Sequence, residues 1–144
     1  MTDPILVTRK LAVLREHLAR LRRRLPESAE SLKKNVDLLD AIALSVLVVV
    51  QEAVDIAFHL ASDEGWGMPS TYRAGFELLA EHGVIDADLA SRLGGAARLR
   101  NRIAHGYASV DVDTLFSGLP AGIVAFDAFA VEIARYLLTP RSTD

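Results

Sequence analysis

Residues 32–60 constrain the fold most, because apolar side chains recur there at the spacing of a long helix. Intervals of three and four residues place the following positions on one helical face: Leu32, Val36, Leu39, Ile42, Val46, Val49, Ala53, Ala57 and Leu60. The middle of this segment is apolar nearly all round, so it must be packed on several sides, by its own chain or by a second copy. We expect a core helix that begins at a Ser28 or Ser31 cap and runs to about Ser62.

Two other structures for the apolar run Ala41–Val50 are disfavoured. The β-branched residues Val46–Val50 would suit a strand, but no turn residues isolate them and the helical period continues on both sides. The run is also far shorter than the roughly 20 apolar residues that a membrane-spanning helix needs. We therefore expect a buried helix and no membrane partner.

A first helix is predicted from Ile5 to Leu25, where Pro26 cannot donate the next backbone hydrogen bond. Its apolar face consists of Leu11, Leu14, Leu18, Leu21 and Leu25. Five arginines lie on the other face: Arg15, Arg20, Arg22, Arg23 and Arg24. This basic face is either solvated or contacts RNA, and the sequence leaves both alternatives open.

Two further helices follow a break at Gly65–Pro69. We expect Ser70 to cap a short helix from Thr71 to about His82, because a serine oxygen accepts a hydrogen bond from the first turn. Gly83 ends that helix, and Asp86 is placed to open the next one. The helix after Asp86 leads directly into the segment that carries the candidate site.

The last helical region is expected to begin at an Asp113 cap and to reach about Leu138, with a kink or short break near Gly118–Pro120. No strand is required anywhere. At 144 residues the chain is expected to form one domain over residues 1–144, with a frayed tail at residues 139–144. The fold class is therefore all-α, an up-and-down bundle of about five helices.

Composition narrows the function classes. The chain contains no cysteine, which excludes disulfides, thiolate catalysis and thiolate metal sites. That composition fits a reducing compartment, and no signal-peptide pattern is present at the N-terminus, so we expect a cytoplasmic protein. A net charge of -3 argues against a generally basic nucleic-acid binder.

Positive charge is nevertheless concentrated locally. No Asp or Glu occurs between Leu89 and Val110, whereas four arginines do: Arg92, Arg98, Arg100 and Arg102. In the same segment His105 could exchange protons near neutral pH, and an arginine could bind a phosphate, which suggests phosphate-ester chemistry. On a regular helix, however, Arg100 and His105 lie about 140° apart. They converge only if the helix ends or tightens near Ala104, or if a second chain completes the site.

The segment from Arg100 to Tyr107 resembles the Arg-x4-His-x-Tyr signature of HepT-like ribonuclease toxins, which belong to the HEPN superfamily of small all-helical domains. The resemblance extends through residues 51–59 and 69–79, and so covers most of the chain between Leu32 and Leu138. It departs in minor ways, since Ala104 stands where a larger aliphatic residue is common.

The resemblance implies a metal-independent endoribonuclease that acts as a homodimer, with both copies of the motif in the interface cleft. His105 would be the general acid or base for attack of the RNA 2′-hydroxyl on the neighbouring phosphate. Arg100 would bind and stabilise that phosphate, and Asn101 would support the site by polar contacts. Arg98 and Arg102 are candidate RNA contacts, since attraction of RNA to positive surface needs no exact geometry.

The resemblance also implies a partner, an antitoxin of the MNT type that is a small nucleotidyltransferase. That enzyme would use ATP and Mg²⁺ to transfer AMP to Tyr107, while RNA cleavage itself would need no cofactor. Two copies of this chain and the antitoxin could form a larger hetero-oligomer. Adenylate on Tyr107 would place phosphate in the cleft and occupy the arginine-rich surface that RNA needs.

Two alternative functions remain open from the sequence. The chain could be a non-catalytic HEPN interaction module that binds a nucleotidyltransferase, or a structural helical dimer in which the arginine and histidine only satisfy a helix end. Asp55 and His59, four residues apart on the core helix, are expected to share a face as a structural pair or as support for a site.

Overall fold

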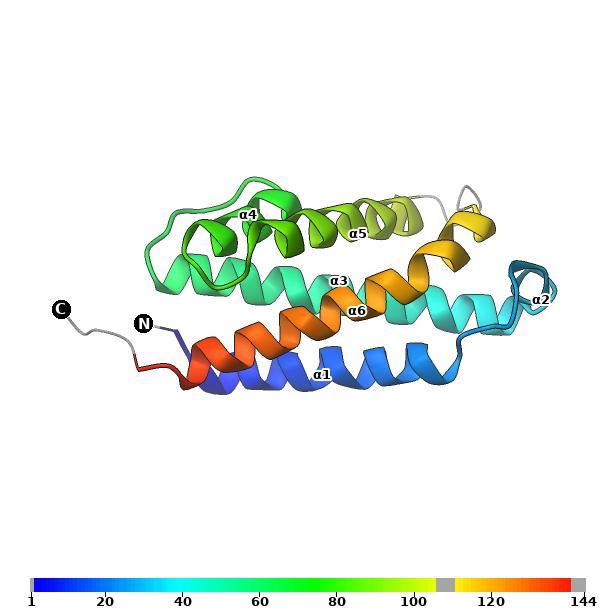
Figure 1. The fold of residues 1–144 in the computed structure, drawn as a ribbon, viewed down its shortest axis with the longest axis horizontal. Coiled ribbons are helices and arrows are strands. Elements are labelled where there is room, and N and C mark those ends of the chain that lie inside the picture. The colour runs from blue at the N-terminus through cyan, green and yellow to red at the C-terminus, as the bar shows by residue number, and fades with distance from the viewer. Residues whose placement is uncertain (1, 106–110, 141–144) are drawn as a thin grey trace.

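The computed structural model describes residues 2–105 and 111–140, without the side chain of His105. Within them the chain forms six helices and no strand, which confirms the predicted all-α bundle (Figure 1). The helices are α1 (Pro4–Arg23), α2 (Ala29–Lys33), α3 (Val36–Asp63), α4 (Tyr72–Glu81), α5 (Ala87–His105) and α6 (Val112–Leu138). The expected frayed tail falls mostly on residues 141–144, outside the described part.

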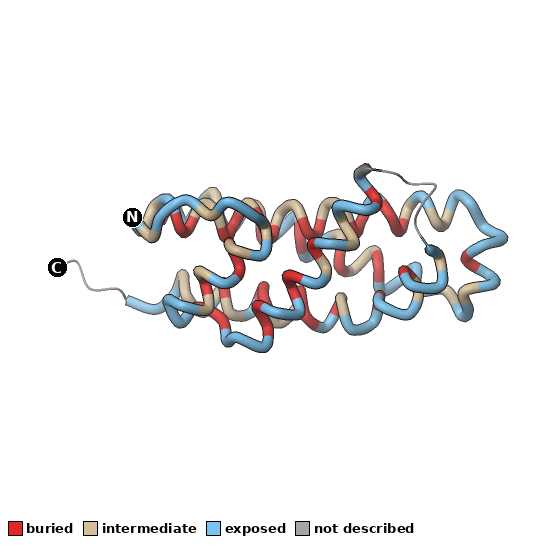
Figure 2. Tube along the Cα trace, turned by 90° about the horizontal axis from the view of Figure 1, so that it is seen from above, coloured by how far each residue is buried: buried red, intermediate tan, exposed pale blue. Residues whose placement is uncertain are grey.

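Helix α3 is the centre of the bundle. α1 packs along one side of it and α6 packs against both, while the pair α4 and α5 covers α3 from the other side (Figure 1). Buried residues follow the inward side of each helix, as Figure 2 shows. α4 reaches α6 through Phe76 and Phe129, both fully buried, whose rings meet edge to face at 5.9 Å. This burial accounts for the apolar middle of α3.

The expected single helix from Ser28 to Ser62 is wrong in its first part, because two helices form there. Ser28 and Ser31 build a capping box around the start of α2, with Ser31 N donating to Ser28 Oγ at 3.1 Å. Asn35 then accepts from Leu38 N at 3.0 Å and starts α3. Two competing cap residues therefore divide a segment whose apolar period runs through both helices.

Caps also explain smaller differences at other helix ends. Thr71, not Ser70, caps α4 and accepts from Ala74 N at 3.0 Å. Asp111, not Asp113, caps α6, while the Asp86 cap of α5 is confirmed by its bond from Leu89 N at 2.7 Å. α6 continues through Pro120, so no break occurs there even though proline removes one backbone donor.

By length and composition alone, α3 and α6 could each cross a membrane. The most apolar 18-residue window of α3 is 56% buried inside the bundle, and that of α6 is 39% buried. The core helix of a soluble protein satisfies the same criterion. The apolar part of α3 is longer than the run at residues 41–50. Packing of α3 inside the bundle accounts for this length.

The contact between α1 and α3 also carries polar groups. Ser45 is 2% exposed, and its hydroxyl lies 3.0 Å from Nδ1 of His17. Burial, followed by the nearby Arg20 and Arg24 charges, lowers the pKa of His17 below its usual value, against the opposing influence of Glu16 and Glu52. His17 is therefore held in its neutral form more strongly in the folded protein than in the unfolded chain.

Candidate active site

Arg100 lies in the last two turns of α5 and reaches across to α3 and α4. Its Nη2 donates to Oε1 of Gln51 at 3.0 Å, and its guanidinium carbon lies 5.6 Å from the centre of the Tyr72 ring. Nη1 donates to Oδ1 of the neighbouring Asn101 at 3.4 Å. Arg100, the phosphate-binding candidate, is therefore in contact with Asn101, its expected supporting residue.

The Arg100 guanidinium keeps hydrogen-bonding capacity. A guanidinium carries five N–H donors in a rigid fork, and the contacts to Gln51 and Asn101 use two of them. Nε is buried and has no hydrogen-bond partner among the described residues. An anion with several acceptor oxygens, such as a phosphodiester, would satisfy the remaining hydrogens of the two terminal nitrogens and the charge together.

Gln51 connects Arg100 to a second polar side chain of α3 and to α1. Its Nε2 donates to Oδ1 of Asp55 at 2.8 Å. The other oxygen of Asp55, Oδ2, accepts from Nζ of Lys10 at 3.3 Å, and Lys10 also lies 3.6 Å from Glu52. A continuous polar chain therefore runs from α1 through α3 to Arg100. Gln51 was not among the predicted site residues, although its spacing of four residues from Asp55 was a usable signal.

The expected pair of Asp55 and His59 does not form. Asp55 is engaged by Gln51 and Lys10, whereas His59 Nε2 lies 3.0 Å from Oδ2 of Asp63, one turn further along α3. Each side chain thus found a partner outside the expected pair. His59 is separate from the polar chain that reaches Arg100.

Arg98 and Arg102 lie on a different side of α5 from Arg100. They line a cavity of about 540 Å³ between α5 and α6 whose walls are mainly apolar. Small residues of α6, including Gly118 and Gly122, face this cavity. The four arginines that the sequence placed in one positive neighbourhood are therefore divided, with Arg100 toward α3 and α4 and the other three toward α6.

Position 105 is the last residue of α5. α5 therefore ends one residue after Ala104, close to the point at which the sequence left an end of the helix open. The helical period places the backbone of position 105 about 140° from that of Arg100 around the axis, and within about 20° of that of Arg98. Tyr107 and the side chain of His105 lie outside the described part.

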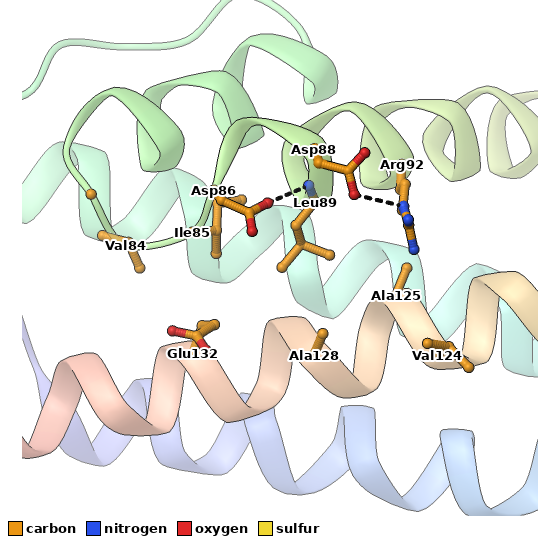
Figure 3. Close-up of a pocket in the computed structure, with 11 residues that line it drawn as sticks. Val84, Ile85, Asp86, Asp88, Leu89, Arg92, Val124, Ala125, Ala128 and Glu132 are labelled. Carbon is orange, nitrogen blue, oxygen red and sulfur yellow. Dashed lines mark hydrogen bonds and ion pairs between the residues drawn. The ribbon is translucent and has the colours of Figure 1, made fainter.

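A second hollow, of about 450 Å³, lies between the start of α5 and α6 (Figure 3). Its charged residues already have partners close by. Asp88 pairs with Arg92 at 3.0 Å, and Asp86 accepts the backbone hydrogen bond that caps α5. It shares Arg92 and Ala125 with the larger cavity beside Arg98 and Arg102. Within residues 2–105 and 111–140, no three His, Asp or Glu side chains are grouped as metal ligands.

Comparison with known proteins gives a family match. A family model described as ribonuclease HepT-like matches residues 14–133. Among curated proteins, the chain is 23% identical to the mRNA nuclease HepT of Shewanella oneidensis over 124 residues, which is 86% of this chain and 92% of the relative. It is 21% identical to the tRNA nuclease HepT of Aphanizomenon flos-aquae over 137 residues, 95% of this chain and 93% of the relative.

Solved structures share the fold. The tri-AMPylated HEPN toxin of Shewanella oneidensis, in complex with an MNT antitoxin, superposes with a TM-score of 0.83 at 24% identity, covering 94% of this chain and 99% of that one. A toxin–antitoxin structure with AMP-PNP superposes with a TM-score of 0.81 at 23% identity, covering 92% and 99%. The fold of the whole bundle is thus shared with these proteins.

Proposed function

We propose that this chain, which belongs to the ribonuclease HepT-like family, is an RNA endonuclease and the toxin of a toxin–antitoxin pair. The observation that carries the proposal is the half-buried Arg100, whose guanidinium Gln51 holds in place while one hydrogen on each terminal nitrogen stays unused. The names of the two curated nuclease relatives support RNA as the substrate.

In the proposed reaction His105 takes the proton of the RNA 2′-hydroxyl as this oxygen attacks the adjacent phosphorus. The bond from phosphorus to the 5′-oxygen breaks, and that oxygen takes up a proton from solvent, leaving a 2′,3′-cyclic phosphate and a 5′-hydroxyl. Arg100 neutralises the charge that builds on the phosphate oxygens, and Asn101 supports Arg100. Neither the attack nor the departure of the leaving oxygen needs a metal in this scheme.

A homodimer with a shared cleft is part of the proposal. A continuous α5 separates positions 100 and 105 by about 140°, so one helix presents them poorly to a single phosphate. Two copies related by a two-fold axis would place two arginines and two histidines beside the same cleft. We propose that the acting Arg100 and His105 come together there.

The proposed regulation is AMPylation of Tyr107 by an MNT-type nucleotidyltransferase that uses ATP and Mg²⁺. An AMPylated toxin in complex with its antitoxin, and a toxin–antitoxin structure with AMP-PNP, support this partner. An adenylate two residues from His105 would bring negative charge to the arginine-rich end of α5 and compete with RNA. The same complex would act in the cytoplasm.

The test uses purified, unmodified chain incubated with RNA in the presence of EDTA. We expect cleavage to products with 2′,3′-cyclic phosphate ends, and we expect His105→Ala to abolish it. Intact RNA, or cleavage by His105→Ala at the parent rate, would overturn the enzyme and leave the interaction module. Co-production with the antitoxin should add the mass of an adenylate to the chain, and Tyr107→Phe should prevent that addition.

A further inference from the structure

The polar chain behind Arg100 has a direction that its chemistry fixes. Lys10 can only donate, the Asp55 carboxylate can only accept, and the Arg100 guanidinium can only donate. Gln51 lies between the last two, so its NH₂ must face Asp55, at 2.8 Å, and its carbonyl oxygen must face Arg100, at 3.0 Å. Any other orientation of the amide would set donor against donor.

We propose that Gln51 and Asp55 are positioning residues for Arg100, and that Asp55 acts by fixing which end of the Gln51 amide Arg100 meets. The inference rests on the proposed ribonuclease function and extends it to α3, outside the motif in α5. Neither residue needs to touch RNA. They act through the one hydrogen bond that anchors the guanidinium from behind.

Anchoring matters because an arginine side chain has many rotamers and a phosphate accepts from a specific pair of donors. The contacts to Gln51 and to the face of Tyr72 hold the guanidinium from two directions. The hydrogen bonds to Gln51 and Asn101 leave one hydrogen on each terminal nitrogen for a ligand. A guanidinium placed before the reaction stabilises the developing phosphorane charge without first reorganising.

One substitution reverses the donors and acceptors along the hydrogen bonds that lead from Asp55 to Arg100, while the side chains keep their shape. In Asp55→Asn, the carbonyl oxygen of residue 55 faces Lys10, because the other orientation would set an NH₂ group against the ammonium, while Lys10 keeps its second contact, to Glu52 at 3.6 Å. The new NH₂ then faces Gln51, which must turn its own carbonyl toward it and present its NH₂ to Arg100. The hydrogen bond from Arg100 to Gln51 is thereby lost, and the N–H groups of the two side chains face each other.

The double variant Gln51→Glu/Asp55→Asn restores the direction with nearly unchanged atoms. One oxygen of the new carboxylate accepts from the amide at position 55, and the other accepts from Arg100. The formal charge of the chain is the same as in the parent, because the carboxylate has moved from position 55 to position 51. Gln51→Glu alone places two carboxylates at the 2.8 Å contact and should be worse than the double variant.

The experiment measures kcat and KM for RNA cleavage by the dimeric parent, both single variants and the double variant. We expect Asp55→Asn to lower kcat by on the order of 10-fold or more with KM changed by about 2-fold or less, because a misplaced group slows the chemical step. The double variant should recover most of that loss. Asp88→Asn, an equivalent exchange on the exposed face of α5, should leave kcat unchanged.

A spectroscopic readout separates this inference from the ribonuclease proposal. The Nε–H resonance of Arg100, assigned with Arg100→Lys, should shift and exchange faster with water in Asp55→Asn, and return in the double variant. If these changes occur while the parent leaves RNA intact, the positioning stands and the ribonuclease proposal fails. If the parent cleaves RNA but Asp55→Asn matches it in kcat and in the Nε–H resonance, or the double variant recovers neither, the positioning is wrong.

Discussion

The two sides of α5 are built for different tasks. Toward α3 and α4 the helix is tightly packed, and Arg100 is fixed by Gln51 and by the ring of Tyr72. Toward α6 it borders a cavity of about 540 Å³, where Arg98 and Arg102 have no ion-pair partner among the described residues. The same side chain type therefore serves as a placed group on one side and as diffuse positive charge on the other.

That difference separates the placement of one guanidinium from the general electrostatic attraction of RNA. A fixed guanidinium can discriminate between ground state and transition state, because its donors are aimed before charge develops. Unpaired arginines on an open surface raise the local concentration of a polyanion and make binding depend on salt. Substitutions on the two sides of α5 should therefore change different measured quantities.

Arg100→Ala should have the largest effect. We expect kcat for RNA cleavage to fall by about 10²–10³-fold, the range for losing one preorganised donor group at a reacting centre. Single-turnover cleavage of a labelled RNA measures it. Arg135→Ala removes an exposed arginine of α6 that pairs with Glu132, and is the matched control. Equal rates for Arg100→Ala and Arg135→Ala would erase the proposed distinction.

Arg98→Ala and Arg102→Ala should act on binding. Each lost phosphate contact lowers the slope of log K against log salt by about 0.7 for single-stranded RNA. Affinity at low salt should drop while kcat stays near the parent value. Titrations of a fluorescent RNA at several salt concentrations, with His105→Ala as an inactive background, measure the affinity. Cleavage rates of Arg98→Ala and Arg102→Ala without that background measure kcat. A large loss of kcat in either variant would show that the α6 side also carries chemistry.

The fold was predictable because the helical period is strong in every segment. Apolar positions of α3 such as Ile42, Val49 and Leu60 are buried as the spacing required. The boundaries were less predictable, because Ser28, Asn35 and Asp111 each compete with neighbouring cap residues, and local hydrogen bonds decide between them. Division of the core segment into α2 and α3 is the clearest example.

The candidate site was predictable in its motif and not in its surroundings. The helical period alone could have separated Arg98 and Arg102 from Arg100, since two residues turn a helix by about 200°. The anchoring by Gln51 depends on α5 packing beside α3, a tertiary contact that a single sequence does not contain. For the same reason Asp55 turned out to meet Lys10 of α1 and not His59. The roles of the motif residues, Arg100, Asn101, His105 and Tyr107, stay predictions.

Adjacent glycines test the packing difference directly. A Cβ at Gly94 would lie 3.1 Å from Cγ of Arg73 on α4, whereas a Cβ at Gly95 would meet nothing within 4 Å. Gly95→Ala should therefore raise the free energy of unfolding by about 1 kcal/mol through helix propensity. Gly94→Ala should gain less, because Arg73 must shift. Chemical denaturation of both variants measures the difference, and equal gains would contradict the tighter packing on the α4 side.

The smallest effect concerns pH, and it separates the histidine of α5 from His17, which is partly buried between α1 and α3. Because burial lowers the pKa of His17, the unfolded chain takes up a proton first as pH falls. The contribution of His17 to the free energy of unfolding should therefore be constant above about pH 6.5. It should decrease as the pH falls from there through the lowered pKa of His17. His17→Gln should remove that decrease, since glutamine does not titrate.

The pH dependence of kcat should keep its shape in His17→Gln, because the proton that matters for cleavage is assigned to His105 on α5. Denaturation curves and cleavage rates over the same pH series test both parts, and a kcat profile that shifts with His17→Gln would mean that folding, and not His105, sets the acid limb.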